Sequence, residues 1–137
     1  QTGSFTDVYP FYALDVLEKY LAEDETHEIV SEKAVYKFSA SFSRGRSFIE
    51  FSSGLKNISE KEKNMIAAYM DCYNQNHLAK LFVKKVQVAY GRQTYTAFVQ
   101  EQLVPHIKRG KKCLLSYGVV GYNGELCLLI TAVGNLD

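Results

Sequence analysis

The dipeptide Asn123-Gly124 lies between two apolar runs, CLLSYGVV before it and ELCLLITAV after it. A two-residue type I′ turn requires positive φ at both central residues, and Asn followed by Gly suits that requirement. The stretch from Lys112 to Gly134 therefore predicts a β-hairpin. Its two long apolar strands commit this stretch to an antiparallel sheet.

The register of this hairpin follows from the turn. If Tyr122 and Glu125 flank the turn, facing residues have numbers that sum to 247. One face is then apolar and should point into the core, whereas the other is mixed. A slip by one residue would bury Ser116 and Thr131, so the register is well specified. The predicted pairs are Val119–Leu128, Tyr117–Ile130 and Leu115–Ala132 on the core face, and Ser116–Thr131, Gly118–Leu129 and Val120–Cys127 on the other.

A second hairpin is predicted from Leu81 to Val99, with Gly91-Arg92 as a type II′-like turn. Facing residues then have numbers that sum to 183, which places Val88 opposite Tyr95 on the core side. Val86–Ala97 and Lys84–Val99 are the next pairs, and the reverse face is expected to be largely solvated because it carries Lys85, Gln87, Thr94 and Thr96.

Alternation of aromatic and polar residues between Tyr36 and Phe42 predicts a half-buried strand. The glycine in Arg44-Gly45-Arg46 favours a short turn there. Phe48 to Phe51 then starts another strand, which ends at Ser52-Ser53-Gly54.

Two amphipathic helices are expected. The first has Asp7 as its cap and Pro10 in its first turn, and it ends at the acidic run 23–25. The second runs from Glu60 to Tyr73 behind a capping box of Ser59 and Glu62. The segment 100–107, which contains Pro105, predicts a helical turn across one end of the sheet.

These elements predict an α+β fold: a mostly antiparallel, curled six-stranded sheet with two helices. The chain should form a single domain over residues 1–137, with a loose lead-in at 1–7. A twisted sheet of this size tends to curl toward a partial barrel. From about Lys80 to Gly134, the order of two hairpins joined by a helical turn is similar to the layout of an OB-type barrel.

Motifs for metal, phosphate or nucleophilic chemistry do not occur in the sequence. The three histidines are far apart and no Cys-x-x-Cys is present, so we expect neither a metal nor a cofactor. Three cysteines are expected to be buried thiols, with Cys113 and Cys127 on opposite sheet faces. Cys72 lies five residues before His77 but on the predicted helix, where a packing role is favoured.

Charge is distributed unevenly along the chain. Residues 1–63 carry 11 acidic and 8 basic side chains (net −3), and residues 64–137 carry 4 acidic and 8 basic side chains (net +4). Basic groups can pair with phosphates and aromatic rings can stack on bases, as in single-strand binders of the OB type. The candidate binding surface consists of Lys84, Lys85, Tyr90, Arg92, His106, Lys108, Arg109, Lys111 and Lys112.

The favoured hypothesis is a non-catalytic binding or interaction module for a protein or small ligand. An OB-type single-stranded nucleic-acid binder is the alternative, although the net charge of only +1 does not favour it. An enzyme is the third reading, and a deep pocket lined by Glu101, His106 and Lys112 would support it. The chain starts at Gln1 and has no transmembrane stretch, which fits an exported or cell-envelope protein as well as a cytosolic fragment.

Overall fold

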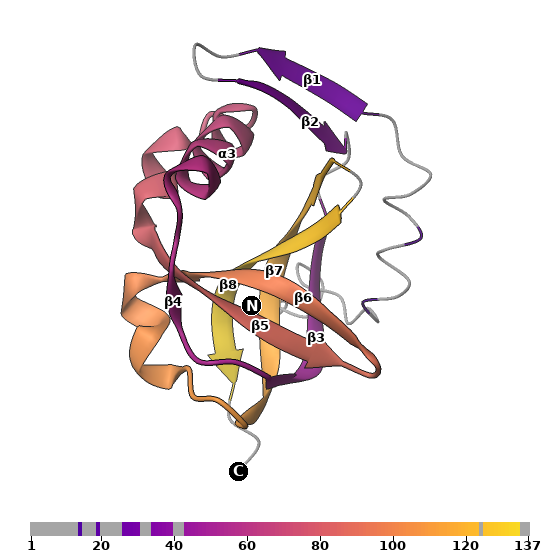
Figure 1. The fold of residues 1–137 in the computed structure, drawn as a ribbon, viewed down its shortest axis with the longest axis vertical. Coiled ribbons are helices and arrows are strands. Elements are labelled where there is room, and N and C mark those ends of the chain that lie inside the picture. The colour runs from indigo at the N-terminus through magenta and orange to yellow at the C-terminus, as the bar shows by residue number, and fades with distance from the viewer. Residues whose placement is uncertain are drawn as a thin grey trace, which may run out of the picture.

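Five strands close into a barrel, to which three further strands and the helices are attached (Figure 1). The computed structural model describes residues 14, 19, 26–30, 34–39, 43–123 and 125–134. The barrel strands are β3 (Ser43–Phe51), β5 (Phe82–Tyr90), β6 (Gln93–Gln100), β7 (Lys112–Tyr122) and β8 (Glu125–Gly134).

The strands follow one another around the barrel as β7-β3-β5-β6-β8, and pairing of β8 with β7 closes the circle. All these pairs are antiparallel except β6 with β8, which run parallel from Thr96–Cys127 to Phe98–Leu129. The predicted α+β class is thus confirmed, and the barrel is consistent with an OB-like architecture. Along the chain β5 and β6 are its second and third strands.

The barrel interior confirms the predicted core face of the last hairpin. Leu115, Tyr117, Val119, Leu128 and Ile130 are all buried in one cluster. Tyr122 faces Glu125 and Tyr117 faces Ile130 as expected, and Asn123 has a φ of 51°. Gly124 lies outside the described residues.

The register prediction is wrong beyond Tyr117, where β8 contains a bulge. Ser116 faces Ala132 rather than Thr131, and Leu115 faces Val133 rather than Ala132. One extra residue in β8 lets the strand bend around the barrel, which turn geometry alone does not predict. The β5–β6 register, by contrast, follows the prediction from Tyr90–Gln93 to Lys84–Val99.

A second apolar cluster lies outside the barrel, beneath helix α3 (Glu60–Asp71). Ile66 and Tyr69 of α3 pack with Phe98, Leu129 and other outward-facing residues of the barrel. The capping box at the start of α3 is present as predicted, since Ser59 Oγ accepts from the Glu62 N–H and Glu62 Oε1 accepts from the Ser59 N–H.

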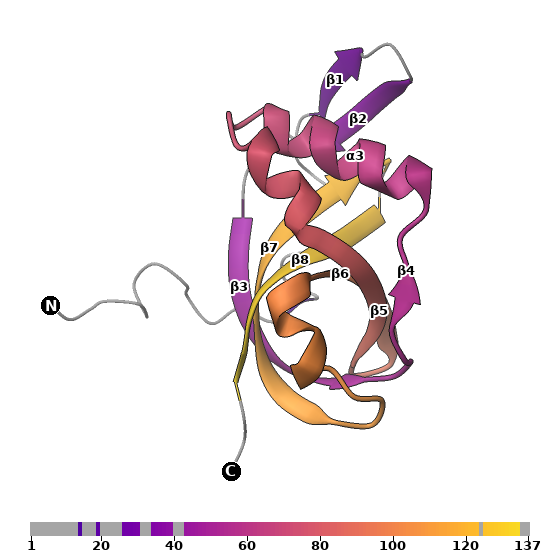
Figure 2. The same cartoon turned by 90° about the vertical axis from the view of Figure 1, so that its left-hand side faces the viewer.

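The hairpin of β1 (Thr26–Val30) and β2 (Val35–Ser39) completes this second layer. Phe38 of β2 meets Tyr69 of α3 edge to face, with ring centroids 5.4 Å apart. In Figures 1 and 2 the hairpin and α3 lie together at one end of the molecule. The outer barrel face is therefore covered at that end, and it is more apolar than a solvated face would be.

Three short elements connect the larger ones: β4 (Lys56–Asn57), and the 3₁₀ helices η1 (Asn76–Leu81) and η2 (Glu101–His106). η2 is the helical turn expected near Pro105. Leu103, Val104 and Ile107 pack against the barrel-interior cluster, so η2 and the residue after it close one side of the barrel (Figure 2).

The predicted turn at Gly45 and the predicted number of strands are wrong, and most of the first predicted helix lies outside the described residues. Arg44-Gly45-Arg46 is not a turn but part of β3, and Gly45 pairs in register with the buried Tyr117. β1 and β4 were not expected, so the described residues form eight strands where six were predicted. Of the first predicted helix, the described Leu14 and Lys19 are helical; the cap at Asp7, the acidic end at 23–25 and the lead-in fall outside the described residues.

Candidate functional site

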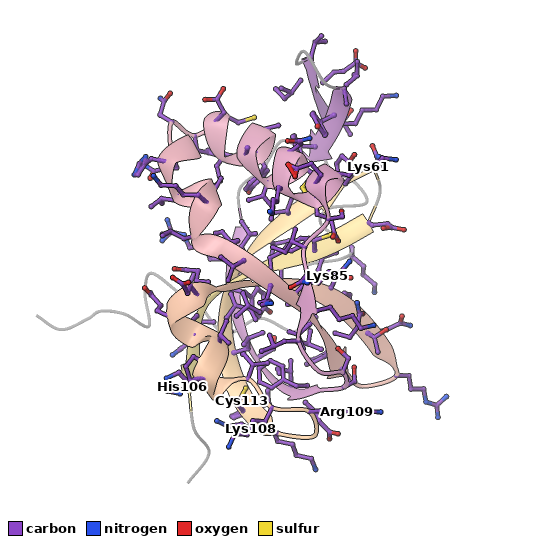
Figure 3. The ribbon with its side chains drawn as sticks, turned by 60° about the vertical axis from the view of Figure 1, so that its left-hand side comes forward. Lys61, Lys85, His106, Lys108, Arg109 and Cys113 are labelled. Atoms are coloured by element: carbon purple, nitrogen blue, oxygen red, sulfur yellow. The ribbon has the colours of Figure 1, made fainter. Side chains whose placement is uncertain are left out.

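The basic and aromatic residues singled out in the sequence are divided between separate parts of the molecule. Figure 3 shows Lys85 beside α3, whereas His106, Lys108 and Arg109 lie at the far end of the barrel. Arg92 is exposed in the β5–β6 turn. The fold therefore does not gather the nine residues into one surface.

Lys84 and Lys85 are engaged in contacts within the protein. Lys84 Nζ donates to Asn57 Oδ1 on β4, and Lys85 Nζ lies 3.0 Å from both carboxylate oxygens of Glu62 on α3. Burial alone would raise the pKa of Glu62, but the Ser59 N–H and the Lys85 ammonium outweigh that effect and hold its pKa below the usual value. This pair ties α3 to the barrel and leaves Lys85 poorly placed for a phosphate.

The group at the far end consists of His106, Lys108, Arg109, Lys111 and Lys112. Lys111 Nζ donates to the His106 carbonyl oxygen at 3.4 Å, and Gly110, with a φ of 86°, turns the connector back toward β3. Tyr90 packs against the barrel-interior cluster, and Tyr95 is buried inside it. The expected combination of cations with exposed rings is thus not formed by these residues.

A pocket of about 570 Å³ lies between the second half of α3, η1 and the outer face of the barrel. This volume falls within the range of known small-molecule sites, roughly 300–1,000 Å³. Most of its lining is apolar or aromatic, and the polar groups are amides, hydroxyls and one guanidinium. The lining residues are Arg44, Tyr69, Met70, Tyr73, Gln75, Leu78, Leu81, Phe82, Gln100, Gly118, Leu129 and Thr131.

The floor of the pocket is open at Gly118 of β7. Apart from its chain neighbours, no heavy atom lies within 4 Å of the point that a Cβ on Gly118 would occupy. The hairpin turn does not need this glycine, and it relieves no crowding there. A side chain at residue 118 would point into the pocket, beside Leu129 on β8.

The helical wall is held in place by Tyr69. Its hydroxyl donates to the Val119 carbonyl oxygen at 3.2 Å, and its ring lies 5.3 Å from that of Tyr73. Burial raises the pKa of Tyr69 well above its usual value, so this hydroxyl stays protonated and keeps its donor role. Tyr73 and Leu81 stand at the rim with 36% and 40% of their surface exposed.

The sequence predicted the amphipathic helix over Glu60–Tyr73 but not that Tyr69, Met70 and Tyr73 would line a pocket. The pocket was missed because its walls come from η1, which was not predicted, and from strands far apart in the sequence. Within the sequence, Gly118 was the available signal, since a glycine in a strand interior can mark a site where a ligand approaches the backbone.

A row of side chains on the outer face of β3 was also missed. Arg44, Arg46 and Phe48 alternate with the inward-facing Gly45 and Ser47, and Phe48 is 55% exposed. The signal was present as two-residue alternation, but the turn assigned to Gly45 interrupted it. Among the described residues, Arg46 Nε is the buried side-chain polar atom that has no hydrogen-bond partner.

Other candidate chemistry is limited in the described part of the chain. No group of three His, Cys, Asp or Glu side chains there could hold a metal ion. Cys113 and Cys127 are buried on opposite sides of the sheet as expected, but Cys72 is exposed rather than buried, because it follows the last turn of α3. Neither Glu101, His106 nor Lys112 lines the pocket.

The helices described in the structure include none that is long and apolar enough to cross a membrane. No protein-family model matches the chain, and no curated protein matches it.

Proposed function

We propose that the protein is a binding module that takes up a ligand with an apolar body in the pocket between α3 and the barrel. The observation that carries the proposal is the apolar pocket itself, with its open floor at Gly118. Apolar and aromatic walls with a few polar groups are typical of small-molecule sites. Amide and hydroxyl groups at Gln75, Gln100 and Thr131 can orient such a ligand.

Two features support binding over a purely structural gap. The walls are fixed by the Tyr69–Val119 hydrogen bond, so the pocket is preformed and a ligand need not order it. Exposed apolar surface at Tyr73 and Leu81 forms its entrance. Covering apolar surface yields about 25 cal/mol per Å², so a ligand that covers a few hundred Å² gains several kcal/mol before entropic costs.

The test is a fluorescence titration with N-phenyl-1-naphthylamine, an uncharged aromatic probe that brightens in apolar sites. We expect the native protein to bind the probe and Gly118→Leu to weaken binding at least tenfold, because the leucine occupies the pocket. The matched control is Gly54→Leu, since Gly54 also has open space in front of its Cβ position but lies outside the pocket.

Both variants should keep the circular dichroism spectrum and melting temperature of the native protein to within a few degrees. Equal probe binding by the native protein and Gly118→Leu would contradict the proposal, as would a native protein that does not bind the probe.

A single-stranded nucleic-acid binder is the second candidate, and the OB-like barrel favours it. In OB folds the face of the second and third strands contacts the nucleic acid. Here those strands are β5 and β6, but α3 packs over Phe98 of that face and pairs with Lys85. Titration of a labelled oligothymidine at 50 and 200 mM salt tests it, and an absence of salt-dependent binding at micromolar protein would remove this candidate.

A further inference from the structure

We infer that the ligand of the pocket carries an anionic group, and that Arg44 and Arg46 on β3 hold this group at the edge of the pocket. The ligand would then be an amphiphilic anion: an apolar body with a carboxylate, sulfonate or phosphate head. This inference rests on the proposed function and specifies the chemistry of its ligand.

Strand geometry places both arginines on the same side of the sheet as the pocket. Arg44 lines the pocket and pairs in register with Gly118 of β7, which forms its floor. Arg46 follows two residues later on the same face, about 7 Å away along the strand. Arg44 therefore lies at the pocket, and Arg46 is the next residue along the same face of β3.

The residues of β7 that face the two arginines are small. Arg44 lies opposite Gly118 and Arg46 lies opposite Ser116, so both neighbours on β7 have small side chains. The carboxylate of Glu50 lies four residues beyond Arg46 on the same face of β3 and is paired in register with Lys112. Arg44 and Arg46 are therefore the charged residues of β3 that lie nearest the pocket.

Arg46 has an unfulfilled hydrogen-bonding capacity. Its Nε is buried and lacks an acceptor, which costs roughly 1–3 kcal/mol for a buried donor. The side chain as a whole is only half-buried, and a rotation of its guanidinium would break no hydrogen bond at Nε. Pairing with a ligand anion would relieve that cost in the bound state.

Arginine suits this role better than lysine would. The planar guanidinium binds carboxylate, sulfonate or phosphate oxygens with two parallel hydrogen bonds, and it is always charged. A charge-assisted pair of this kind at a half-buried site contributes about a factor of ten in affinity, which corresponds to 1.4 kcal/mol. The apolar pocket would supply the remainder through burial.

The experiment compares two probes that share one aromatic body. 8-Anilinonaphthalene-1-sulfonate carries a sulfonate that N-phenyl-1-naphthylamine lacks. We expect the native protein to bind the sulfonate about tenfold more tightly than the uncharged probe. Arg46→Gln should remove most of this preference and leave the uncharged probe unaffected, and the double variant Arg44→Gln, Arg46→Gln should remove all of it.

Arg92→Gln is the matched control, because it removes one positive charge from an exposed turn outside the pocket. It should change neither affinity, and Gly118→Leu should weaken both. Equal affinity of the native protein for the two probes would overturn the inference and leave the proposed function standing. A preference for the sulfonate that survives in the double variant would also overturn it, whereas failure of both probes would overturn the proposed function itself.

A lipid headgroup could present the same chemistry as a free amphiphile. Sedimentation with vesicles of phosphatidylcholine containing one-third phosphatidylserine separates the two sources. We expect no co-sedimentation, in keeping with a free amphiphile. Co-sedimentation that Arg46→Gln abolishes would overturn the assignment to a free molecule and make the anion a lipid headgroup.

Discussion

Replacing Glu62 by glutamine tests how strongly one ion pair fastens α3 to the barrel. Glu62 has two roles, since its carboxylate accepts the Ser59 N–H in the capping box and pairs with Lys85 on β5. Glutamine can still accept from Ser59, so Glu62→Gln removes the charge and retains the cap. Glu62→Ala removes both.

The stability that the Glu62–Lys85 ion pair contributes can be judged from its burial and geometry. Lys85 and Glu62 keep 28% and 23% of their side-chain surface exposed, and both carboxylate oxygens lie 3.0 Å from Nζ. Exposed pairs are worth up to about 1 kcal/mol, and this geometry places the pair at the upper end. We therefore expect Glu62→Gln to lower the free energy of unfolding by about 1 kcal/mol, or the melting temperature by roughly 3–4 °C for a chain of this size. Loss of the cap in Glu62→Ala should cost about a further 0.5–1 kcal/mol.

At acid pH, the native protein and Glu62→Gln should have the same free energy of unfolding. The pKa of Glu62 is lower in the folded state than in the unfolded chain, so the stabilisation is complete above the unfolded pKa of about 4.3. It is lost as the pH falls through the folded pKa, where the carboxylate becomes neutral like the amide.

Urea unfolding followed by circular dichroism at pH 7 and pH 3 measures the loss of stability in Glu62→Gln and its dependence on pH. Combining Lys85→Met with Glu62→Gln completes a double-mutant cycle, in which we expect a coupling energy of about 1 kcal/mol. A Glu62→Gln variant as stable as the native protein at pH 7, or a difference that persists unchanged at pH 3, would refute this reasoning.

Three further outcomes follow from the structure. Gly118→Ala should raise the free energy of unfolding by about 0.4–1 kcal/mol, because the unfolded chain loses freedom and the folded site has room; a urea midpoint that falls would show that the space is closed. A thiol reagent should label only exposed Cys72 in the native protein and all three cysteines in denaturant, because Cys113 and Cys127 are buried and burial raises the pKa of each to about 11; native labelling of more than one thiol would disagree. Burial also raises the pKa of Tyr117 to about 12, so the stability that its neutral hydroxyl contributes is complete below pH 10 and is lost as the pH rises toward 12. The free energy of unfolding of Tyr117→Phe should therefore fall less between pH 10 and pH 12 than that of the native protein. An equal fall in both proteins would contradict this.

Local signals in the sequence were reliable where the interaction they report is itself local. The turn at Gly91-Arg92 fixed the register of β5 and β6, and Ser59 with Glu62 fixed the start of α3. Each depends on residues within a few positions of one another, so tertiary contacts had little scope to change them. The bulge after Tyr117 is the counterexample, because closure of the barrel rather than the turn decides where β8 bends.

The candidate site is formed by contacts between residues far apart in the sequence, which local patterns do not predict. Alternation shows that Arg44 and Phe48 share a face with each other, but it cannot show that Gly118 lies beside Arg44. The basic residues that looked like one group proved to be separated, since Lys85 turns to Glu62 while His106 lies at the other end of the barrel. Adjacency in sequence is a poor guide to adjacency on a barrel, where each strand leads away from the last.

By itself the sequence determined which side chains face inward along β5 and β6, and along the last hairpin between its turn and its bulge, because turn chemistry and two-residue alternation act over short distances. Only the tertiary structure decided that β6 runs parallel to β8, that α3 covers one part of the outer face, and that a pocket remains at Gly118. These features arise where segments far apart in the chain bury apolar surface together. Many pairings of such segments would satisfy the same local pattern, and the packing of the whole domain selects one of them.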